Sequence, residues 1–454
     1  MKETDEISNV YFLGIGGIGM SALARYFRYL GKQVSGYDKT ETALTRSLTE
    51  EGITIHYTDD ISLADKNADI IIYTPAIPKD HSELQFFMDS GYDLMKRSEV
   101  LGLITQDGFN ICVAGTHGKT TTSAMVAHIL RDTAYGCTAF LGGISANYNT
   151  NFWTSGNKVC VAEADEYDRS FLKLFPNIAV ITSMDADHLD IYGNEKNMQD
   201  SFIEFSGNIH KDGLLIKKYS ISRSDEFHGS RQLTYSLGDK RADVYAENIS
   251  IKNASYHFDV VIKDHQMKGF ELHMGGSHNI ENAVAAITVA YELTIQEEDI
   301  KKAVAGFAGV KRRFEYVIKT ADRIMIDDYA HHPEELRALI MSAKELYPDW
   351  KCTVVFQPHL FTRTRDLASG FARVLDMADE VILLPIYPAR ELPIEGVSSN
   401  MVAEKMNKAQ RSTLSKEELI EKINKDKPVL LITAGAGDID MLAEPIKNEL
   451  KDLK

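Results

Sequence analysis

Cysteine is scarce in this chain of 454 residues, and its few copies are scattered. The four positions are Cys112, Cys137, Cys160 and Cys352. They show neither the close pairs that bind zinc nor the dense spacing of a small disulfide-linked domain, so we expect reduced structural thiols in a cytoplasmic protein. Long apolar runs are missing as well. Without a stretch of about 18 apolar residues, or an apolar segment near the N-terminus, we expect neither a membrane span nor export.

Positive charge is also in short supply, since 50 lysines and arginines face 66 aspartates and glutamates, for a formal net charge of −16. This balance argues against a nucleic-acid partner, although anionic small molecules respond to local fields and are not excluded. We find no repeat array, coiled-coil heptads or low-complexity segment. With 44% hydrophobic and 26% charged residues, the chain has the composition of a soluble globular protein, and its length predicts about three domains.

The most informative stretch is NICVAGTHGKTTT, at residues 110–122. Its apolar run predicts a buried strand, followed by a glycine-bearing turn and the start of a helix. Unpaired backbone N–H groups and the helix dipole make such a turn a site for anions. Lys119 adds a full charge for the β- and γ-phosphates, and the Thr120 hydroxyl is placed to bind Mg²⁺. The spacing departs from the usual P-loop, which has glycine where Val113 stands, but we predict an ATP site.

A second glycine turn lies near the N-terminus, where residues 10–38 predict strand, turn, helix and strand. Gly14, Gly16 and Gly19 form the pattern G-x-G-x-x-G, and Asp38 follows about 20 residues further on. Alone, this pattern indicates a dinucleotide site and leaves an NAD-dependent dehydrogenase as an alternative. In physical terms, the pattern supplies a helix N-terminus that can bind a pyrophosphate and a carboxylate that can accept hydrogen bonds from a sugar or base. A UDP-sugar fits those terms as well as NAD does.

Two predicted strands in the central region run into polar side chains, in the segments KVCVAEADEYD and NIAVITSMDADHLDIY. In an open parallel sheet, ligands bind beyond the carboxyl ends of the strands. We therefore expect these two ends and the GTHGKT turn to converge on one site, with Glu163 and His188 as Mg²⁺ ligands. Residues 213–275 predict a small antiparallel sheet. The helix after it carries Asn279 and Asn282 in its first turns, where capping is the alternative role.

Strand, loop and helix patterns recur after residue 311 and predict a third, parallel α/β domain. Its loops carry the side chains of His331, His332, His359, Arg363 and Arg365. Such a cluster suits capture of a carboxylate and an amine nucleophile, with surface solubility as the competing account. The fold class is therefore α/β in three domains. We expect a Rossmann-like domain (1–107), a P-loop-type ATPase domain with the small antiparallel sheet (108–312) and a second Rossmann-like domain (313–454).

The motifs together resemble those of the Mur ligases, the amide-forming enzymes of peptidoglycan precursor synthesis. The resemblance covers essentially the whole chain and rests on GIGGIGMS, GTHGKTTT, EADE, DADHLD, SHN-EN, RRFE, DDYAHHP and QPHLFTRTRD. It implies an ATP- and Mg²⁺-dependent enzyme, monomeric or homodimeric, that joins L-alanine to the lactyl carboxylate of UDP-N-acetylmuramate. The near alternative is the recycling member, which attaches a tripeptide to the same sugar nucleotide. In that member we expect other residues in place of GIGGIGM and QPHLFTRT.

The resemblance also assigns roles to residues. Those of the UDP-sugar site are Gly14, Gly16, Gly17, Ile18, Gly19, Asp38 and Thr74. Those of the ATP site are Gly115, Thr116, His117, Gly118, Lys119, Thr120, Thr121, Asn279, Asn282, Arg313 and Asp328. The amino-acid site comprises Tyr329, His331, His359 and Arg363, and the metal ligands are Thr120, Glu163 and His188. The catalytic set is Lys119, His188, His331, His359 and Arg363. Amide formation from a carboxylate needs an activated acyl phosphate, which must be shielded from water, so we expect the third domain to close over the second, with Arg313 at the junction.

Two positions depart from the family pattern. Leu360 stands where some relatives carry an arginine, so Arg363 must do more of the carboxylate recognition. Ile203 stands where members that add later residues have a carbamylated lysine, which implies a metal site without carbamate. A nucleotide-binding switch without synthetic chemistry is a further alternative, but it leaves the His-Arg loops of the third domain without a role. The dehydrogenase leaves GTHGKTT and DADHLD unexplained.

Overall fold

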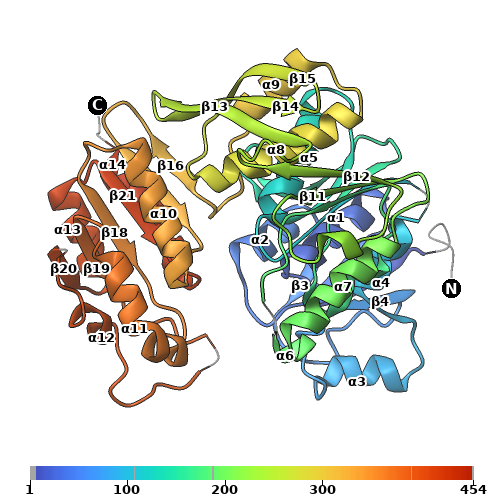
Figure 1. The fold of residues 1–454 in the computed structure, drawn as a ribbon. Helices are drawn as coiled ribbons and strands as arrows, with labels where there is room; N and C mark the ends of the chain where they lie inside the picture. Colours follow the sequence, from blue (N-terminus) through green and yellow to red (C-terminus); the bar gives the residue numbers. More distant parts are fainter. Residues whose placement is uncertain (1–6, 107, 187–188, 390, 409, 452–454) are drawn as a thin grey trace. The chain divides into compact units, whose positions relative to one another are not determined.

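The computed structural model describes residues 7–106, 108–186, 189–389, 391–408 and 410–451 (Figure 1). Contacts between residues divide the chain into two compact units. One comprises Met1–Glu247, Val260–Met267 and Glu281–Val304, and the other comprises Asn248–Asp259, Lys268–Ile280 and Ala305–Lys454. Within the described part of the chain, no helix is long and apolar enough to cross a membrane. The predicted domain boundaries stay a prediction.

The N-terminal part of the first unit is a five-stranded parallel sheet in the order β3-β2-β1-β4-β5. Its elements are β1 (Asn9–Leu13), α1 (Ile18–Tyr29), β2 (Gln33–Tyr37), α2 (Ala43–Glu50), β3 (Thr54–His56), β4 (Ile70–Tyr73), α3 (Ser82–Asp89), β5 (Leu94–Lys96) and α4 (Arg97–Ile104). Strand order reverses between β1 and β4, and the glycine turn follows β1 at this point. The predicted strand, turn and helix are confirmed here, at the edge where α/β sheets bind ligands.

The central sheet has ten strands in the order β15-β14-β13-β12-β11-β10-β6-β9-β7-β8. Its first part comprises β6 (Phe109–Ala114), α5 (Lys119–Asp132), β7 (Thr138–Ser145), β8 (Thr150–Trp153), β9 (Val159–Glu163), the 3₁₀ helix η2 (Tyr167–Lys173), β10 (Ile178–Ile181), α6 (Leu189–Tyr192) and α7 (Glu195–Gly207). Strand β6 lies between β9 and β10 and pairs parallel with both. The carboxyl ends of three neighbouring strands therefore meet at one edge, as predicted.

The expected small antiparallel sheet is not a separate sheet. Strand β11 (Leu214–Lys218) pairs parallel with β10, and β12 (Arg231–Ser236) pairs parallel with β11, so this region extends the central sheet. Strands β13 (Val244–Lys252), β14 (Ser255–Ile262) and β15 (His265–Leu272) complete it, and α8 (Ser277–Glu292) and α9 (Glu297–Gly306) follow. The alternating pattern and short turns indicated strands correctly, but periodicity does not say which neighbour a strand pairs with.

The C-terminal sheet has the order β16-β17-β21-β18-β19-β20 and is parallel except for the pair β16–β17. Its strands are β16 (Glu315–Lys319), β17 (Ile324–Asp328), β18 (Cys352–Phe356), β19 (Glu380–Leu383), β20 (Gln410–Thr413) and β21 (Leu430–Ala434). Its helices are α10 (Pro333–Leu346), α11 (Phe361–Leu375), α12 (Asn400–Ala403), α13 (Lys416–Asp426), the 3₁₀ helix η4 (Asp438–Leu442) and α14 (Ala443–Leu450). The parallel α/β pattern predicted after residue 311 is confirmed. The edge strands β16 and β20 lack long apolar runs.

All four cysteines are buried and free, as the scattered spacing predicted. Ile203 lies on α7 and is a partly buried side chain that packs against the apolar core of the first unit.

Candidate active site

The turn between β6 and α5 depends on two glycines with left-handed backbone angles. Gly115 has φ +135°, and a Cβ there would lie 2.1 Å from Oγ1 of Thr182. Gly118, with φ +82°, is the N-cap of α5. Residues after β10 brace the turn, since the His117 N–H donates to Ser183 Oγ at 2.8 Å. The anion site predicted from the sequence is therefore built by two strand ends rather than by its own loop alone.

Lys119 is held across this turn by a buried carboxylate. Its Nζ lies 2.7 Å from Oε2 of Glu166 and donates to the carbonyl of Gly115 at 2.6 Å. Only 13% of the lysine side chain and 1% of the glutamate side chain are exposed. Burial raises the pKa of Glu166, and the charge of Lys119 opposes that rise. Glu166 is the last residue of the EADE motif, and the sequence analysis gave it no role as the partner of Lys119.

Glu163 and Thr120, two of the predicted metal ligands, lie together beside the turn. Burial raises the pKa of Glu163, while the charge of Lys119 and a hydrogen bond with the Thr120 side chain lower it. Oε2 of Glu163 is buried and has no hydrogen-bond partner among the described residues. Gly142 makes room for this carboxylate, because a Cβ there would lie 2.2 Å from the same oxygen.

An unpartnered carboxylate oxygen beside a hydroxyl and a phosphate turn fits a divalent cation with oxygen ligands. Among the described residues, no group of three or more His, Cys, Asp and Glu side chains could hold a metal. An ion here therefore needs phosphate or water oxygens to complete its coordination, as Mg²⁺ commonly does. The predicted ligand His188 lies outside the described residues.

The remaining predicted ATP residues fall into two groups. Thr116, Thr121 and Asn282 lie at the turn itself: Thr116 Oγ1 is 2.9 Å from Ser183 Oγ, Thr121 is buried in the first turn of α5, and Oδ1 of Asn282 is 2.7 Å from the Cβ position of Gly118. Asn279 lies one turn earlier on α8 and donates to the carbonyl of Gly275.

The N-terminal glycine turn is equally crowded. Gly14 has φ +86°, and a Cβ there would lie 2.6 Å from a methyl carbon of Thr74. The Gly16 N–H donates to Oδ2 of Asp38 at 2.8 Å, and Gly17 is the N-cap of α1 without a side-chain capping bond. The predicted sugar-nucleotide residues are thus brought together around an open helix N-terminus, although Asp38 is engaged by the turn itself.

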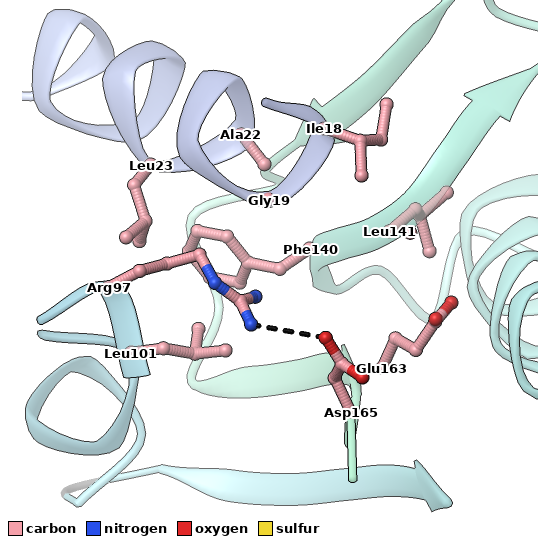
Figure 2. Close-up of a pocket in the computed structure, with 11 residues that line it drawn as sticks. Ile18, Gly19, Ala22, Leu23, Arg97, Leu101, Phe140, Leu141, Glu163 and Asp165 are labelled. Atoms are coloured by element: carbon pink, nitrogen blue, oxygen red, sulfur yellow. Dashed lines mark hydrogen bonds and ion pairs between the residues drawn. The ribbon is translucent and has the colours of Figure 1, made fainter. Parts of the chain in front are cut away.

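A pocket extends from the N-terminal end of α1 to Glu163 (Figure 2). It has a volume of about 80 Å³. Ile18, Gly19, Ala22 and Leu23 of α1 line one side, Phe140, Leu141 and Gly142 of β7 another, and Arg97, Leu101, Glu163 and Asp165 the rest. Arg97 donates from Nη2 to Oδ2 of Asp165 at 3.3 Å, and sequence analysis assigned it no role.

In the C-terminal unit, Asp328 holds the backbone near two other predicted site residues, Arg313 and Tyr329. Its two oxygens accept the N–H groups of Phe314 and Ala330, each at 2.7 Å. Burial raises the pKa of Asp328, and these backbone bonds and Arg313 oppose the rise. The Arg313 guanidinium lies 5.9 Å from the centre of the Tyr329 ring. Arg313, Asp328 and Tyr329 are therefore neighbours.

The predicted amino-acid residues gather in the same unit. The rings of His331 and His359 are 6.2 Å apart, and Nη1 of Arg363 is 3.3 Å from Nδ1 of His359. Burial lowers the pKa of His331, which favours a neutral imidazole. Sequence analysis missed Tyr387, whose ring stacks on His359 at 5.7 Å. Leu360 is the N-cap residue of α11, with φ +70°, and donates its N–H to the carbonyl of Tyr387.

Comparison with known families matches three models along the chain. The Mur ligase family catalytic domain matches residues 9–108, the Mur ligase middle domain residues 113–290, and the Mur ligase glutamate ligase domain residues 312–437. A curated relative from Flavobacterium psychrophilum, a UDP-N-acetylmuramate–L-alanine ligase, is 47% identical over 99% of both chains. This chain belongs to the Mur ligase family. A relative with the same activity from Parabacteroides distasonis is 48% identical and covers 99% of this chain and 98% of its own.

Solved Mur ligase structures share the fold. The UDP-N-acetylmuramate–alanine ligase of Thermotoga maritima matches with a TM-score of 0.84 at 29% identity, covering 98% of this chain and all of its own. The murein peptide ligase of Psychrobacter arcticus matches with a TM-score of 0.69 at 22% identity, over 98% and 99% of the two chains, which shows the fold alone. The predicted three-part α/β architecture and the predicted family are confirmed.

Proposed function

We propose that this chain is an ATP-dependent ligase that joins L-alanine to the lactyl carboxylate of UDP-N-acetylmuramate. The observation that carries the proposal is the pocket of Figure 2, which runs from the N-terminal glycine turn to Glu163 at the phosphate site. A sugar nucleotide with its diphosphate at Gly14 to Gly19 would place its acyl group there. The full-length identity to curated L-alanine-adding ligases supports this member of the family. We place the reaction in the cytoplasm, where ATP and sugar nucleotides are available.

A carboxylate must be activated before an amine can displace one of its oxygens. In the proposed reaction, the lactyl carboxylate attacks the γ-phosphorus of ATP, and ADP leaves. The product is an acyl phosphate. Lys119 is positioned by Glu166 and Gly115 to neutralise charge on the transferring group, and the N–H groups at the start of α5 would donate hydrogen bonds to phosphate oxygens. Catalysis in this step is mostly positioning and electrostatics.

Mg²⁺, when bound, would neutralise charge between the β- and γ-phosphates. Thr120 and Glu163 are the described residues that would hold it, and His188 is the third proposed ligand. The unpartnered Oε2 of Glu163 supports this assignment.

The amine half of the reaction is assigned to the C-terminal unit. We propose that Arg363 pairs with the carboxylate of L-alanine, because a guanidinium forms two parallel hydrogen bonds to that group. The imidazole of His331, or that of His359 beside it, accepts a proton from the ammonium group, so that the amine attacks the carbonyl carbon and phosphate leaves. The lowered pKa of His331 favours this role near neutral pH.

The test is ADP release measured with UDP-N-acetylmuramate, ATP and Mg²⁺ in the presence of single amino acids, with mass analysis of the product. We expect release that depends on L-alanine and a product heavier by one alanyl residue. Release that requires L-alanyl-γ-D-glutamyl tripeptide instead would assign the chain to the recycling activity. Oxidation or reduction of nicotinamide without ADP release would support the dehydrogenase.

A further inference from the structure

Arg97 stands at the centre of the pocket in Figure 2, yet none of the roles above uses it. It is the first residue of α4 and directly follows β5. Its Nη1 approaches within 2.6 Å of the Cβ position of Gly19, near the N-terminus of α1. On its other side it reaches Asp165, two residues beyond Glu163. The guanidinium therefore lies between the sugar-nucleotide turn and the acid that is proposed to bind metal.

The charge balance of this pocket calls for a cation at that position. Glu163 and Asp165 both line the pocket, and Arg97 is the one cationic side chain among its described lining residues. A substrate carboxylate entering here would meet two like charges. Like charges at short range oppose binding, and a guanidinium offsets them.

Most N–H donors of the Arg97 guanidinium are not used by the protein residues that the structure describes. Its one hydrogen bond among the described residues is the single 3.3 Å contact with Asp165. A committed arginine–carboxylate pair is usually bidentate, at about 2.7–2.9 Å. The side chain is 20% exposed, so it is shielded from water but open to the pocket. Neighbouring Lys96 anchors this corner independently, with Nζ 3.1 Å from Asp168.

We propose that Arg97 binds the lactyl carboxylate of the sugar nucleotide and so selects the acyl-bearing substrate. The assignment rests on the proposed function. The carboxylate replaces or shares the long contact with Asp165 and is held between the α1 turn and Glu163, in line for phosphoryl transfer. Two rival roles exist for the same residue: a contact to the diphosphate, and a purely structural latch between α4 and the acidic loop.

The experiment measures calorimetric binding of UDP-N-acetylmuramate and of UDP-N-acetylglucosamine, which lacks the lactyl group, to the full-length protein. The variants are Arg97→Ala, Arg97→Lys and Asp165→Asn, with Lys96→Ala as a matched control for loss of a neighbouring ion pair. Binding of a non-hydrolysable ATP analogue reports whether each variant keeps a folded phosphate site.

We expect Arg97→Ala to weaken UDP-N-acetylmuramate binding roughly 10- to 100-fold and to leave UDP-N-acetylglucosamine binding unchanged. Arg97→Lys should restore part of the preference because it keeps the charge but not the planar fork. Asp165→Asn should retain the preference, since it frees the guanidinium, and Lys96→Ala should retain it too.

If Arg97→Ala weakens the binding of both sugar nucleotides equally, the assignment is overturned in favour of a contact between Arg97 and the diphosphate. If Asp165→Asn loses as much affinity for UDP-N-acetylmuramate as Arg97→Ala, the assignment is overturned in favour of a structural link between α4 and the acidic loop. A wild-type protein that binds neither sugar nucleotide would overturn the proposed function and this assignment with it. Wild-type binding with an unaltered preference in Arg97→Ala would overturn the assignment alone.

Discussion

At the scale of single residues, the proposed phosphate site contains the buried pair of Lys119 and Glu166. A lysine held this way is pre-positioned, so little side-chain entropy is lost when phosphate arrives. The two groups pair in a largely buried site, where charge acts through a lower dielectric than in water. The pair explains why EADE carries a second glutamate as well as the proposed metal ligand.

Lys119→Ala should abolish most turnover while sparing the sugar-nucleotide site. Loss of a group that stabilises charge in the transition state typically lowers the rate about 10²–10³-fold. Steady-state ADP release and calorimetry with UDP-N-acetylmuramate measure the two effects separately. Lys196→Ala, at a 76% exposed position on α7, is the matched control. Loss of sugar-nucleotide binding in Lys119→Ala would contradict this division of roles.

Asp327 predicts a pH dependence of stability in the C-terminal unit. Burial raises the pKa of Asp327 to about 6 from the ordinary 3.8, despite the Arg312 guanidinium 3.2 Å away. The folded state therefore binds this proton more tightly than the unfolded chain, and stability falls as pH rises from about 4 through 6. Asp327→Asn removes that loss. The variant should gain stability relative to wild type between pH 4 and 7, on the order of 3 kcal/mol.

Thermal unfolding midpoints across this pH range check the prediction, with Asp349→Asn as the control at an exposed position. A difference between Asp327→Asn and wild type that stays constant with pH would show that the buried carboxyl does not titrate there.

At the scale of elements, the strand, turn and helix of the phosphate site could be predicted almost entirely from local sequence. The apolar run of the strand, the glycines of the turn and the first residues of the helix all lie within residues 110–122. The contacts of Thr182 and Ser183 with that turn could not be predicted from local sequence. These two residues follow a different strand and meet the turn only because β6 pairs with β10. Arg97 was missed for the same reason: its partner Asp165 is 68 positions away.

Gly115→Ala should destroy the phosphate turn as an element. The added methyl group meets Thr182 Oγ1 at 2.1 Å and backbone nitrogen of Ser183 at 2.8 Å, so the turn and β10 must separate. Calorimetry should show at least a tenfold loss of affinity for a non-hydrolysable ATP analogue, about 1.4 kcal/mol. Gly156→Ala is the matched control, because Gly156 also has positive φ but open space around its Cβ position. Equal effects of the two changes would assign the loss to backbone strain alone.

At the scale of the whole molecule, periodicity and turn residues predicted three α/β parts, and the fold confirms them. Pairing was harder to predict: β11 and β12 extend the central sheet instead of forming their own, because strand partners are chosen by packing that a local pattern does not record. The gathering of Tyr329, His331, His359 and Arg363 followed from parallel strands that end at one edge. His188 remains a prediction.

The central claim is that ATP activates the lactyl carboxylate for attack by L-alanine. It is tested most directly by labelling that carboxylate with ¹⁸O and analysing the phosphate released during synthesis by mass spectrometry. Transfer of the γ-phosphoryl group to the carboxylate, followed by displacement by the amine, predicts one ¹⁸O atom in the phosphate for each amide formed from fully labelled substrate. Unlabelled phosphate accumulating in step with the amide product would contradict the account.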